Sequence, residues 1–385
     1  MQSASKAIEL KKISVTRGRS SSRMSSKTQT LTEISAYAFQ GELVALLGES
    51  GIGKTSVLRL IAGLERLDRG ELSLRGITLQ TPVQTLDPEG RQLAYVSQTS
   101  LLFPHLNVLD NVRFSLMNIA PKAQRRVAEE ALSLVELGSS ADCLPHQLSG
   151  GQSRRVELAR ALARVFSREA DLLLIDEAFS SLEPALRTRI LTRISKQCSE
   201  SQLTVIWSTH LIDVALTHAQ RLWVLERQDR LYNASPFELY TRPPTRFTAS
   251  LLGELSWASL ESLILGGEGW ERFSDSTEKS SHELVVGLRP TPWTLSTDDH
   301  AEHGSRAGKD RNEDRYLLRG RITDIKPTIE WILVDLRIGK ETEDLPNSTL
   351  IRMKLSQSIR LQINQEVTLQ YLGEPLVFRG DEVSS

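Results

Sequence analysis

Eight residues near position 50 have the types and the spacing needed to hold a chain of phosphate groups. Gly48-Glu49-Ser50-Gly51-Ile52-Gly53-Lys54-Thr55 fits the pattern G-x-x-x-x-G-K-[ST]. Glycines let main-chain N–H groups approach phosphate oxygens closely, and the helix N-terminus that follows adds positive potential. Lys54 is expected to neutralise charge on the β- and γ-phosphates, and the Thr55 hydroxyl to ligate Mg²⁺. This segment, the phosphate loop, predicts binding of a nucleoside triphosphate.

Two neighbouring carboxylates follow an apolar run further along the chain. A buried strand is predicted over Leu172 to Ile175, and it ends in Asp176 and Glu177. Core strands often end in acidic residues, so this pair gains its meaning from the phosphate loop. Beside a bound nucleotide, Asp176 can hold Mg²⁺ through its water shell and Glu177 can polarise the attacking water. His210 follows the strand predicted over Thr204 to Trp207 and is expected to contact the γ-phosphate.

Leu148-Ser149-Gly150-Gly151-Gln152, the signature segment, is a second candidate anion site. It introduces a helix predicted over Gln152 to Phe166. Main-chain N–H groups and the dipole at the start of that helix can face a phosphate. The phosphate loop already provides one such site in each chain.

Apolar patterning indicates the elements that position these groups. From Ala7 to about Tyr240, short apolar runs alternate with helical patterns, which is typical of a mostly parallel sheet with crossover helices. A third buried strand is predicted over Leu43 to Leu47, an amphipathic helix over Arg125 to Leu137, and a Ser-rich loop over Ser20 to Lys27. The helix after the phosphate loop is predicted to bury Val57, Leu60, Ile61 and Leu64.

A different pattern begins after Thr241-Arg242-Pro243-Pro244, where consecutive prolines disfavour a helix. Beyond about Ser256, short alternating segments predict a small all-β domain; their apolar members include Ile351, Met353, Leu355, Val367, Leu369 and Tyr371. The polar stretch Ser296 to Arg315 contains His300 and His303. We interpret it as a solvated charged loop rather than a metal site.

Composition limits the remaining possibilities. A chain of 385 residues suggests two domains. A formal net charge of −1 argues against non-specific electrostatic binding of nucleic acid. Four arginines, at positions 154, 155, 160 and 164, are interpreted as a solvated helix face with structural ion pairs. No apolar run reaches the roughly 18 residues of a membrane span, and the first thirty residues lack a secretion signal, so a cytosolic location is expected. Cys143 and Cys198 are expected to be reduced thiols.

Taken in order, these motifs resemble those of the nucleotide-binding subunits of ATP-binding cassette (ABC) transporters. The resemblance rests on the phosphate loop, Gln98 in Tyr95-Val96-Ser97-Gln98, the signature segment, Asp176-Glu177 and His210. It implies an α/β P-loop NTPase over residues 7–240, with a helical subdomain at about 99–165. It also implies ATP and Mg²⁺ as ligands.

The resemblance further implies a role for each motif. Gln98 would help coordinate Mg²⁺ and sense the membrane partner, Glu177 would be the catalytic base, and His210 would be the switch residue on the γ-phosphate. The signature segment of one subunit would close on the ATP held by another, which implies a head-to-tail homodimer with two composite sites.

The chain departs from the family pattern at several positions. Val15-Thr16-Arg17-Gly18-Arg19 lacks the usual aromatic residue that stacks on adenine, which leaves Arg17 or Arg19 as candidates or makes base recognition loose. Glu183, in Ser180-Ser181-Leu182-Glu183, replaces an aspartate and lengthens an arm that would communicate across the dimer. Ala178 replaces a common proline, and Leu211 stands where an acid is frequent. None of these changes removes a catalytic group, so active hydrolysis with altered coupling or rate is expected.

Without membrane spans of its own, an importer subunit needs separate permease subunits. Ser100 to Leu106 offers apolar groups that either receive a permease helix or belong to the subdomain core. Pro236 to Pro244, followed by Gly287-Leu288-Arg289-Pro290, resembles importers with a C-terminal oligonucleotide/oligosaccharide-binding-like (OB-like) regulatory domain, here 241–385 including a linker. Those importers carry ferric iron, spermidine/putrescine, molybdate, sulfate or sugars, and Leu102 to Leu106 looks most like the ferric-iron group.

The resulting expectation is a peripheral subunit at the cytoplasmic face of the inner (plasma) membrane, served indirectly by a periplasmic or extracellular solute-binding protein. Two other classes stay open. A soluble cassette ATPase acting on nucleic acid or ribosomes generally has tandem cassettes or a long coiled-coil insertion, and neither is visible here. A purely regulatory nucleotide binder would tend to lose Glu177 or Lys54, and both are present.

Overall fold

The computed structural model describes residues 5–17, 29–98, 101–180, 182–227, 229–259, 284–288, 293–295, 316–327, 331–338, 349–356, 362, 366–371 and 375–379. The chain divides into two compact units, Met1–Phe237 and Glu238–Ser385. Several predictions fall outside the described residues: the loop over Ser20 to Lys27, Arg19, Ser100, Ser181, Arg289 with Pro290, and the stretch Ser296 to Arg315 with both of its histidines.

A six-stranded sheet forms the centre of the first unit. Its order is β10(Leu231–Ala234), β9(Arg221–Leu225), β3(Leu43–Leu47), β8(Thr204–Ser208), β7(Leu172–Asp176) and β6(Leu93–Val96). All neighbours pair in parallel except β10 with β9. The three predicted strands are confirmed: β3 has the predicted bounds, and β7 and β8 each extend one residue further, to Asp176 and Ser208. Their five residues are buried throughout, as expected of central parallel strands.

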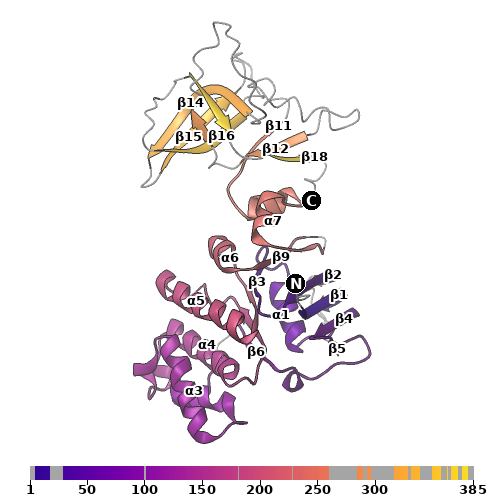
Figure 1. Ribbon diagram of the computed structural model, residues 1–385, viewed down its shortest axis with the longest axis vertical. Helices are drawn as coiled ribbons and strands as arrows, with labels where there is room; N and C mark the ends of the chain where they lie inside the picture. The colour runs from indigo at the N-terminus through magenta and orange to yellow at the C-terminus, as the bar shows by residue number, and fades with distance from the viewer. Residues whose placement is uncertain are drawn as a thin grey trace, which may run out of the picture. The chain divides into compact units, whose positions relative to one another are not determined.

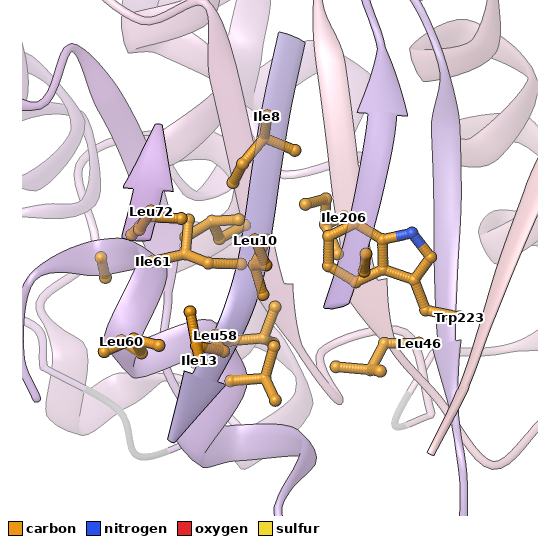
Figure 2. Packing of buried hydrophobic residues seen from close by; sticks show 14 of the residues in the cluster. Ile8, Leu10, Ile13, Leu46, Leu58, Leu60, Ile61, Leu72, Ile206 and Trp223 are labelled. Carbon is orange, nitrogen blue, oxygen red and sulfur yellow. The ribbon is translucent and has the colours of Figure 1, made fainter. Parts of the chain in front are cut away.

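A second, four-stranded antiparallel sheet has the order β2(Gln29–Phe39), β1(Lys6–Arg17), β4(Arg69–Leu74) and β5(Ile77–Gln80). Helix α1(Lys54–Ala62) contributes Leu58, Leu60 and Ile61 to a core that also includes Ile8 from β1 and Trp223 from β9, as Figure 2 shows. One predicted core residue is wrong. Leu64 lies beyond the end of α1 and is exposed, because Gly63 ends the helix with a left-handed φ of 84°.

The middle of the chain is helical. It contains α2(Val108–Arg113), α3(Pro121–Leu134) and α4(Gly150–Phe166), with short 3₁₀ turns at Phe114–Leu116, Gly138–Ser140 and Pro145–Gln147. Figure 1 shows α3 and α4 side by side. The predicted helix over 125–137 is shifted: Pro121 at the first helical position starts α3 earlier, and it ends at Leu134. Helix α4 begins at Gly150, two residues before its predicted start, because Ser149 caps it.

The remaining elements of the first unit are a 3₁₀ turn at Pro88–Gly90, α5(Pro184–Ser201) and α6(Ile212–His218), and α7(Pro236–Thr241) crosses into the second unit. No helix in the described part of the chain combines the length and the apolar content that a membrane span requires.

The second unit contains α8(Arg246–Leu251) and two antiparallel sheets. One has the order β11(Ser256–Ser259), β12(Leu284–Leu288), β18(Leu376–Arg379). The other has the order β13(Trp293–Leu295), β17(Glu366–Tyr371), β14(Tyr316–Pro327), β15(Trp331–Ile338), β16(Thr349–Ser356). The predicted alternation is confirmed, because Ile351, Met353 and Leu355 are buried while Arg352 is exposed, and Val367, Leu369 and Tyr371 are buried as well.

Candidate functional site

The order of strands brings the predicted motifs to one edge of the central sheet. The phosphate loop follows β3, Asp176 ends β7, Ser208 ends β8, and Gln98 lies two residues beyond β6. These four strands are consecutive and parallel, so their carboxyl ends share an edge, where open α/β sheets bind ligands. His210 lies two residues beyond β8 and is exposed.

The phosphate loop has the backbone conformation that its glycines allow. Gly48, Gly51 and Gly53 have φ angles of 149°, 80° and 118°. The Lys54 ammonium is buried and donates hydrogen bonds to the carbonyl oxygens of Gly48 and Glu49, both at 2.8 Å. Burial lowers the pKa of Lys54 from its ordinary value, and the charges of Glu177, Asp176 and Glu49 oppose that shift. The ammonium is therefore paired with carbonyl groups of its own loop.

Asp176 is completely buried, and its two carboxylate oxygens differ in their surroundings. Oδ1 accepts a hydrogen bond of 2.6 Å from the Ser208 hydroxyl. Oδ2 is buried and has no hydrogen-bond partner among the described residues. An unpaired buried carboxylate oxygen is costly and calls for a partner such as a metal ion or its water. The chemistry of this oxygen fits Mg²⁺, which prefers carboxylate and water oxygens.

A cavity of about 380 Å³ is lined by Thr55, Tyr95, Gln98 and Asp176, together with other residues. The three predicted magnesium ligands thus face the same space, although they come from α1, the segment after β6, and β7. Burial and then the charge of nearby Asp176 raise the pKa of Tyr95 above its ordinary value.

Glu177 has a left-handed backbone, with φ at 54°. Its main-chain N–H donates to the Ser208 hydroxyl oxygen at 3.0 Å, and its side-chain Oε2 accepts a hydrogen bond from Gln98 Nε2 at 3.4 Å. The predicted catalytic base and the predicted Gln98 are therefore in contact across 79 residues of sequence.

The signature segment ends in a reciprocal helix cap. Ser149 Oγ accepts from the Gln152 N–H at 3.2 Å, and Gln152 Oε1 accepts from the Ser149 N–H at 2.8 Å. Ser149 and Gly150 are exposed, and a Cβ atom built on Gly150 or Gly151 would meet no atom within 4 Å. The 17-residue helix α4 thus presents an open N-terminus, a geometry that suits an anion.

The structural ion pairing predicted for the arginines of α4 is confirmed for Arg154, but these arginines are half-buried and do not lie on a solvated face. Arg154 pairs with Glu157 at 3.0 Å, and their side chains are only 11% and 3% exposed. Arg155 donates to the Val135 carbonyl oxygen and Arg160 to the Leu101 carbonyl oxygen. These side chains satisfy carbonyl groups of neighbouring segments, so their role in this unit is structural.

Sequence reasoning gave no role to Ser208, which contacts both acidic residues. A signal was present, because Ser208 is the polar residue that directly follows the strand predicted over Thr204 to Trp207, two residues before His210. What was missing was the pairing of β8 with β7, which sets Ser208 opposite Asp176.

The chain matches a known protein family and is similar to curated proteins. Residues 31–180 match the model of a family described as ABC transporter. The chain is 43% identical over 224 residues to the Fe(3+) ions import ATP-binding protein FbpC of Pseudomonas fluorescens, covering 58% of this chain and 62% of that protein. It is 35% identical over 312 residues to the sulfate/thiosulfate import ATP-binding protein CysA of Yersinia pseudotuberculosis, covering 78% and 79%.

A similar solved structure is a dimeric ATP-binding cassette in a post-hydrolysis state, bound to ADP and phosphate. Its TM-score is 0.52 at 27% sequence identity, and the alignment covers 60% of this chain and 98% of that one.

Proposed function

Because the chain belongs to the ABC transporter family of ATP-binding ATPases, we propose that it hydrolyses ATP as the energising subunit of a bacterial importer. Two observations carry the hydrolytic part: Thr55, Gln98 and Asp176 line one cavity, and the buried Asp176 Oδ2 has no hydrogen-bond partner among the described residues. Mg²⁺, when bound there, neutralises charge on the β- and γ-phosphate oxygens.

The residues of the chain divide the remaining work. Lys54 leaves the loop carbonyls for the β- and γ-phosphates, and main-chain N–H groups of the phosphate loop hold the β-phosphate. Glu177 polarises the attacking water, and the Gln98 amide, which donates to Glu177 Oε2 at 3.4 Å, orients that carboxylate. His210, exposed beyond β8, contacts the γ-phosphate.

We propose a head-to-tail homodimer as the active form. The N-terminus of α4 is open and carries no acidic residue in its first turn, so it can receive a phosphate from outside the chain. In the dimer the signature segment of each subunit would close on the ATP of the other. The dimeric state of the solved cassette supports this arrangement.

A partner surface is proposed on the helical part of the first unit. Leu101 and Met117 are 61% and 70% exposed, and Phe114 is exposed beside Phe103, with their ring centroids 4.4 Å apart. The sequence left the 100–106 segment open between a docking surface and subdomain core. The exposure of Leu101 favours docking of an apolar helix from a permease subunit.

Ferric iron is the substrate we propose for the importer. The amino-acid sequence of Leu102 to Leu106 and the name of the FbpC relative support ferric iron, whereas the CysA relative is named for sulfate and thiosulfate. Sulfate, spermidine/putrescine, molybdate and sugars stay as alternatives, because the solute-binding protein and permease choose the substrate. The second unit is proposed to be the OB-like regulatory domain.

The test is to purify the chain together with the permease subunits that bind it, in lipid, and to measure ATP hydrolysis with and without candidate solute-binding proteins. We expect stimulation by a binding protein loaded with ferric iron. Stimulation by a protein loaded with another solute would keep the importer and replace the substrate. Stimulation by DNA, RNA or ribosomes, with no permease recovered, would overturn the importer proposal.

A further inference from the structure

Ser208 is the last residue of β8 and lies opposite Asp176, the last residue of β7, in the parallel register. Both residues are buried, with at most 1% of either exposed. The Ser208 side chain forms hydrogen bonds both with Asp176 at the end of β7 and with Glu177 in the loop that follows.

The hydroxyl of Ser208 acts as acceptor and donor at the same time. Its oxygen accepts the main-chain N–H of Glu177 at 3.0 Å, and its hydrogen is donated to Asp176 Oδ1 at 2.6 Å. A serine hydroxyl has one hydrogen, so accepting from Glu177 leaves that hydrogen for Asp176. With Oδ1 engaged, Oδ2 is the carboxylate oxygen left for another partner.

The contact with Glu177 also bears on backbone conformation. A left-handed φ of 54° is unfavourable for a residue with a Cβ. The Ser208 acceptor lies where the Glu177 N–H points, and Ser180 N and Oγ donate to the Glu177 carbonyl oxygen at 3.3 and 2.5 Å. Hydrogen bonds on both sides of Glu177 thus hold this conformation, which aims its side chain at Gln98.

We propose that Ser208 is a positioning residue for hydrolysis: one hydroxyl fixes the Asp176 carboxylate so that Oδ2 serves Mg²⁺, and fixes the main chain of Glu177 so that its carboxylate faces the attacking water. This inference rests on the proposed ATPase function. Ser208→Ala removes only the hydroxyl group, which leaves Asp176 Oδ1 and the Glu177 N–H without their partner. Loss of such an outer hydrogen bond typically costs about 10- to 100-fold in metal affinity or activity.

The experiment compares Ser208→Ala and Ser208→Thr with a matched control, Thr204→Ala, in the full-length chain. Thr204 is equally buried on the same strand, and its hydroxyl bonds Gly41 N at 3.3 Å, at the opposite end of β8. For each variant, Mn²⁺ binding in the presence of a non-hydrolysable ATP analogue is measured by electron paramagnetic resonance, and kcat and KM for ATP are measured separately.

We expect Ser208→Ala to weaken Mn²⁺ binding and to lower kcat by about 10- to 100-fold while KM for ATP changes little, because the phosphate loop is intact. Ser208→Thr keeps the hydroxyl and should recover most of both. If alanine or threonine prevents folding, Ser208→Cys, with a weaker donor of similar size, should give intermediate values.

Wild-type values in Ser208→Ala, within about two-fold for both measurements, would overturn the inference, as would an equal loss in Thr204→Ala, which would make the effect general to buried hydroxyls of β8. Absence of ATP hydrolysis in the wild-type chain would instead count against the proposed function. The Mn²⁺ titration keeps these two failures apart, because it needs no turnover.

Discussion

Arg154 donates a hydrogen bond of 2.9 Å from Nη2 to the main-chain carbonyl oxygen of Asp176. Its other terminal nitrogen, Nη1, pairs with Glu157, which in turn accepts the main-chain N–H of Leu101. The helix that begins at the signature segment is therefore tied both to the strand end that carries the acidic pair and to the exposed segment proposed to meet a permease.

This buried pair should be far more important to stability than the exposed pairs of the same unit. Glu157→Ala leaves the Arg154 guanidinium with an uncompensated buried charge, and we expect the free energy of unfolding to fall by about 3–5 kcal/mol. Arg125 and Glu129 provide the control, since they pair at 2.8 Å but are 66% and 53% exposed. Glu129→Ala should cost about 0.5 kcal/mol or less. Urea unfolding measures both, and equal losses would contradict the expectation.

Alanine substitutions at two glycines should distinguish effects on folding and ATP binding from effects on closure of the signature segment over a second ATP. A Cβ atom at Gly48 would lie 2.5 Å from the Leu225 carbonyl oxygen, and its φ of 149° is unfavourable for other residues. Gly48→Ala should therefore lower both stability and ATP affinity. At Gly150 the added Cβ meets nothing within 4 Å, so Gly150→Ala should leave unfolding and ATP binding unchanged but slow hydrolysis if the signature segment closes on a second ATP.

The comparison requires thermal unfolding, binding of a fluorescent ATP analogue and steady-state hydrolysis for both variants. Wild-type hydrolysis in Gly150→Ala would speak against a tightly closed composite site.

The two thiols should differ in reactivity. Burial raises the pKa of Cys198 to about 12, from 9.0, whereas Cys143 is half-buried. At pH 8 we expect iodoacetamide to modify Cys143 in the native chain and Cys198 only after unfolding, because the thiolate is the reacting form. Peptide mass spectrometry assigns the modified residue, and Cys143→Ser should abolish native labelling.

The same shift gives a pH dependence with a fixed sign. Between about pH 9 and 12 the unfolded chain loses the Cys198 proton while the folded chain keeps it, so this thiol contributes stability below pH 9 that is lost as the pH rises. Cys198→Ala should remove that contribution to the slope of stability against pH.

The exposed apolar residues of the helical part should matter for coupling and not for folding. Met117→Glu places a charge on a side chain that is 70% exposed, so the free energy of unfolding should change by less than about 0.5 kcal/mol. We expect basal ATP hydrolysis to persist and stimulation by the permease complex to be lost. Val83→Glu, at another exposed apolar residue of the first unit, is the control and should keep stimulation. Normal stimulation of Met117→Glu would exclude this residue from the docking surface.

What could be predicted from the sequence was local. The phosphate loop, strand β7 and the signature helix can each be recognised from a few consecutive residues, because strand burial and helix capping depend on near neighbours. The contacts of Ser208 with Asp176 and of Gln98 with Glu177 depend instead on which strands are adjacent, across 32 and 79 residues. Leu64 fits the helical period of α1, but the helix ends before it, at Gly63. Arg154 and Arg155 donate to carbonyl groups of distant segments, and no local pattern predicts those partners.

The role of Glu177 as catalytic base can be tested by a substitution that replaces one carboxylate oxygen with an amide nitrogen. Glu177→Gln keeps the size of the side chain and its contact with Gln98 but removes the carboxylate that polarises water, so hydrolysis should fall by about 10²- to 10⁴-fold. If the signature segment of one chain closes on ATP held by another, the unhydrolysed nucleotide should then hold two chains together. Light scattering after size-exclusion chromatography should show a dimer with ATP and a monomer with ADP.

A second change identifies the contact. Ser149 is exposed at the N-terminus of α4, and a glutamate there would repel the phosphates of the opposing ATP without disturbing the buried core. Glu177→Gln combined with Ser149→Glu should therefore bind ATP and stay monomeric. A dimer that survives in the double variant would place the interface elsewhere, and a monomeric Glu177→Gln chain that still hydrolyses ATP rapidly would remove Glu177 from the role of base.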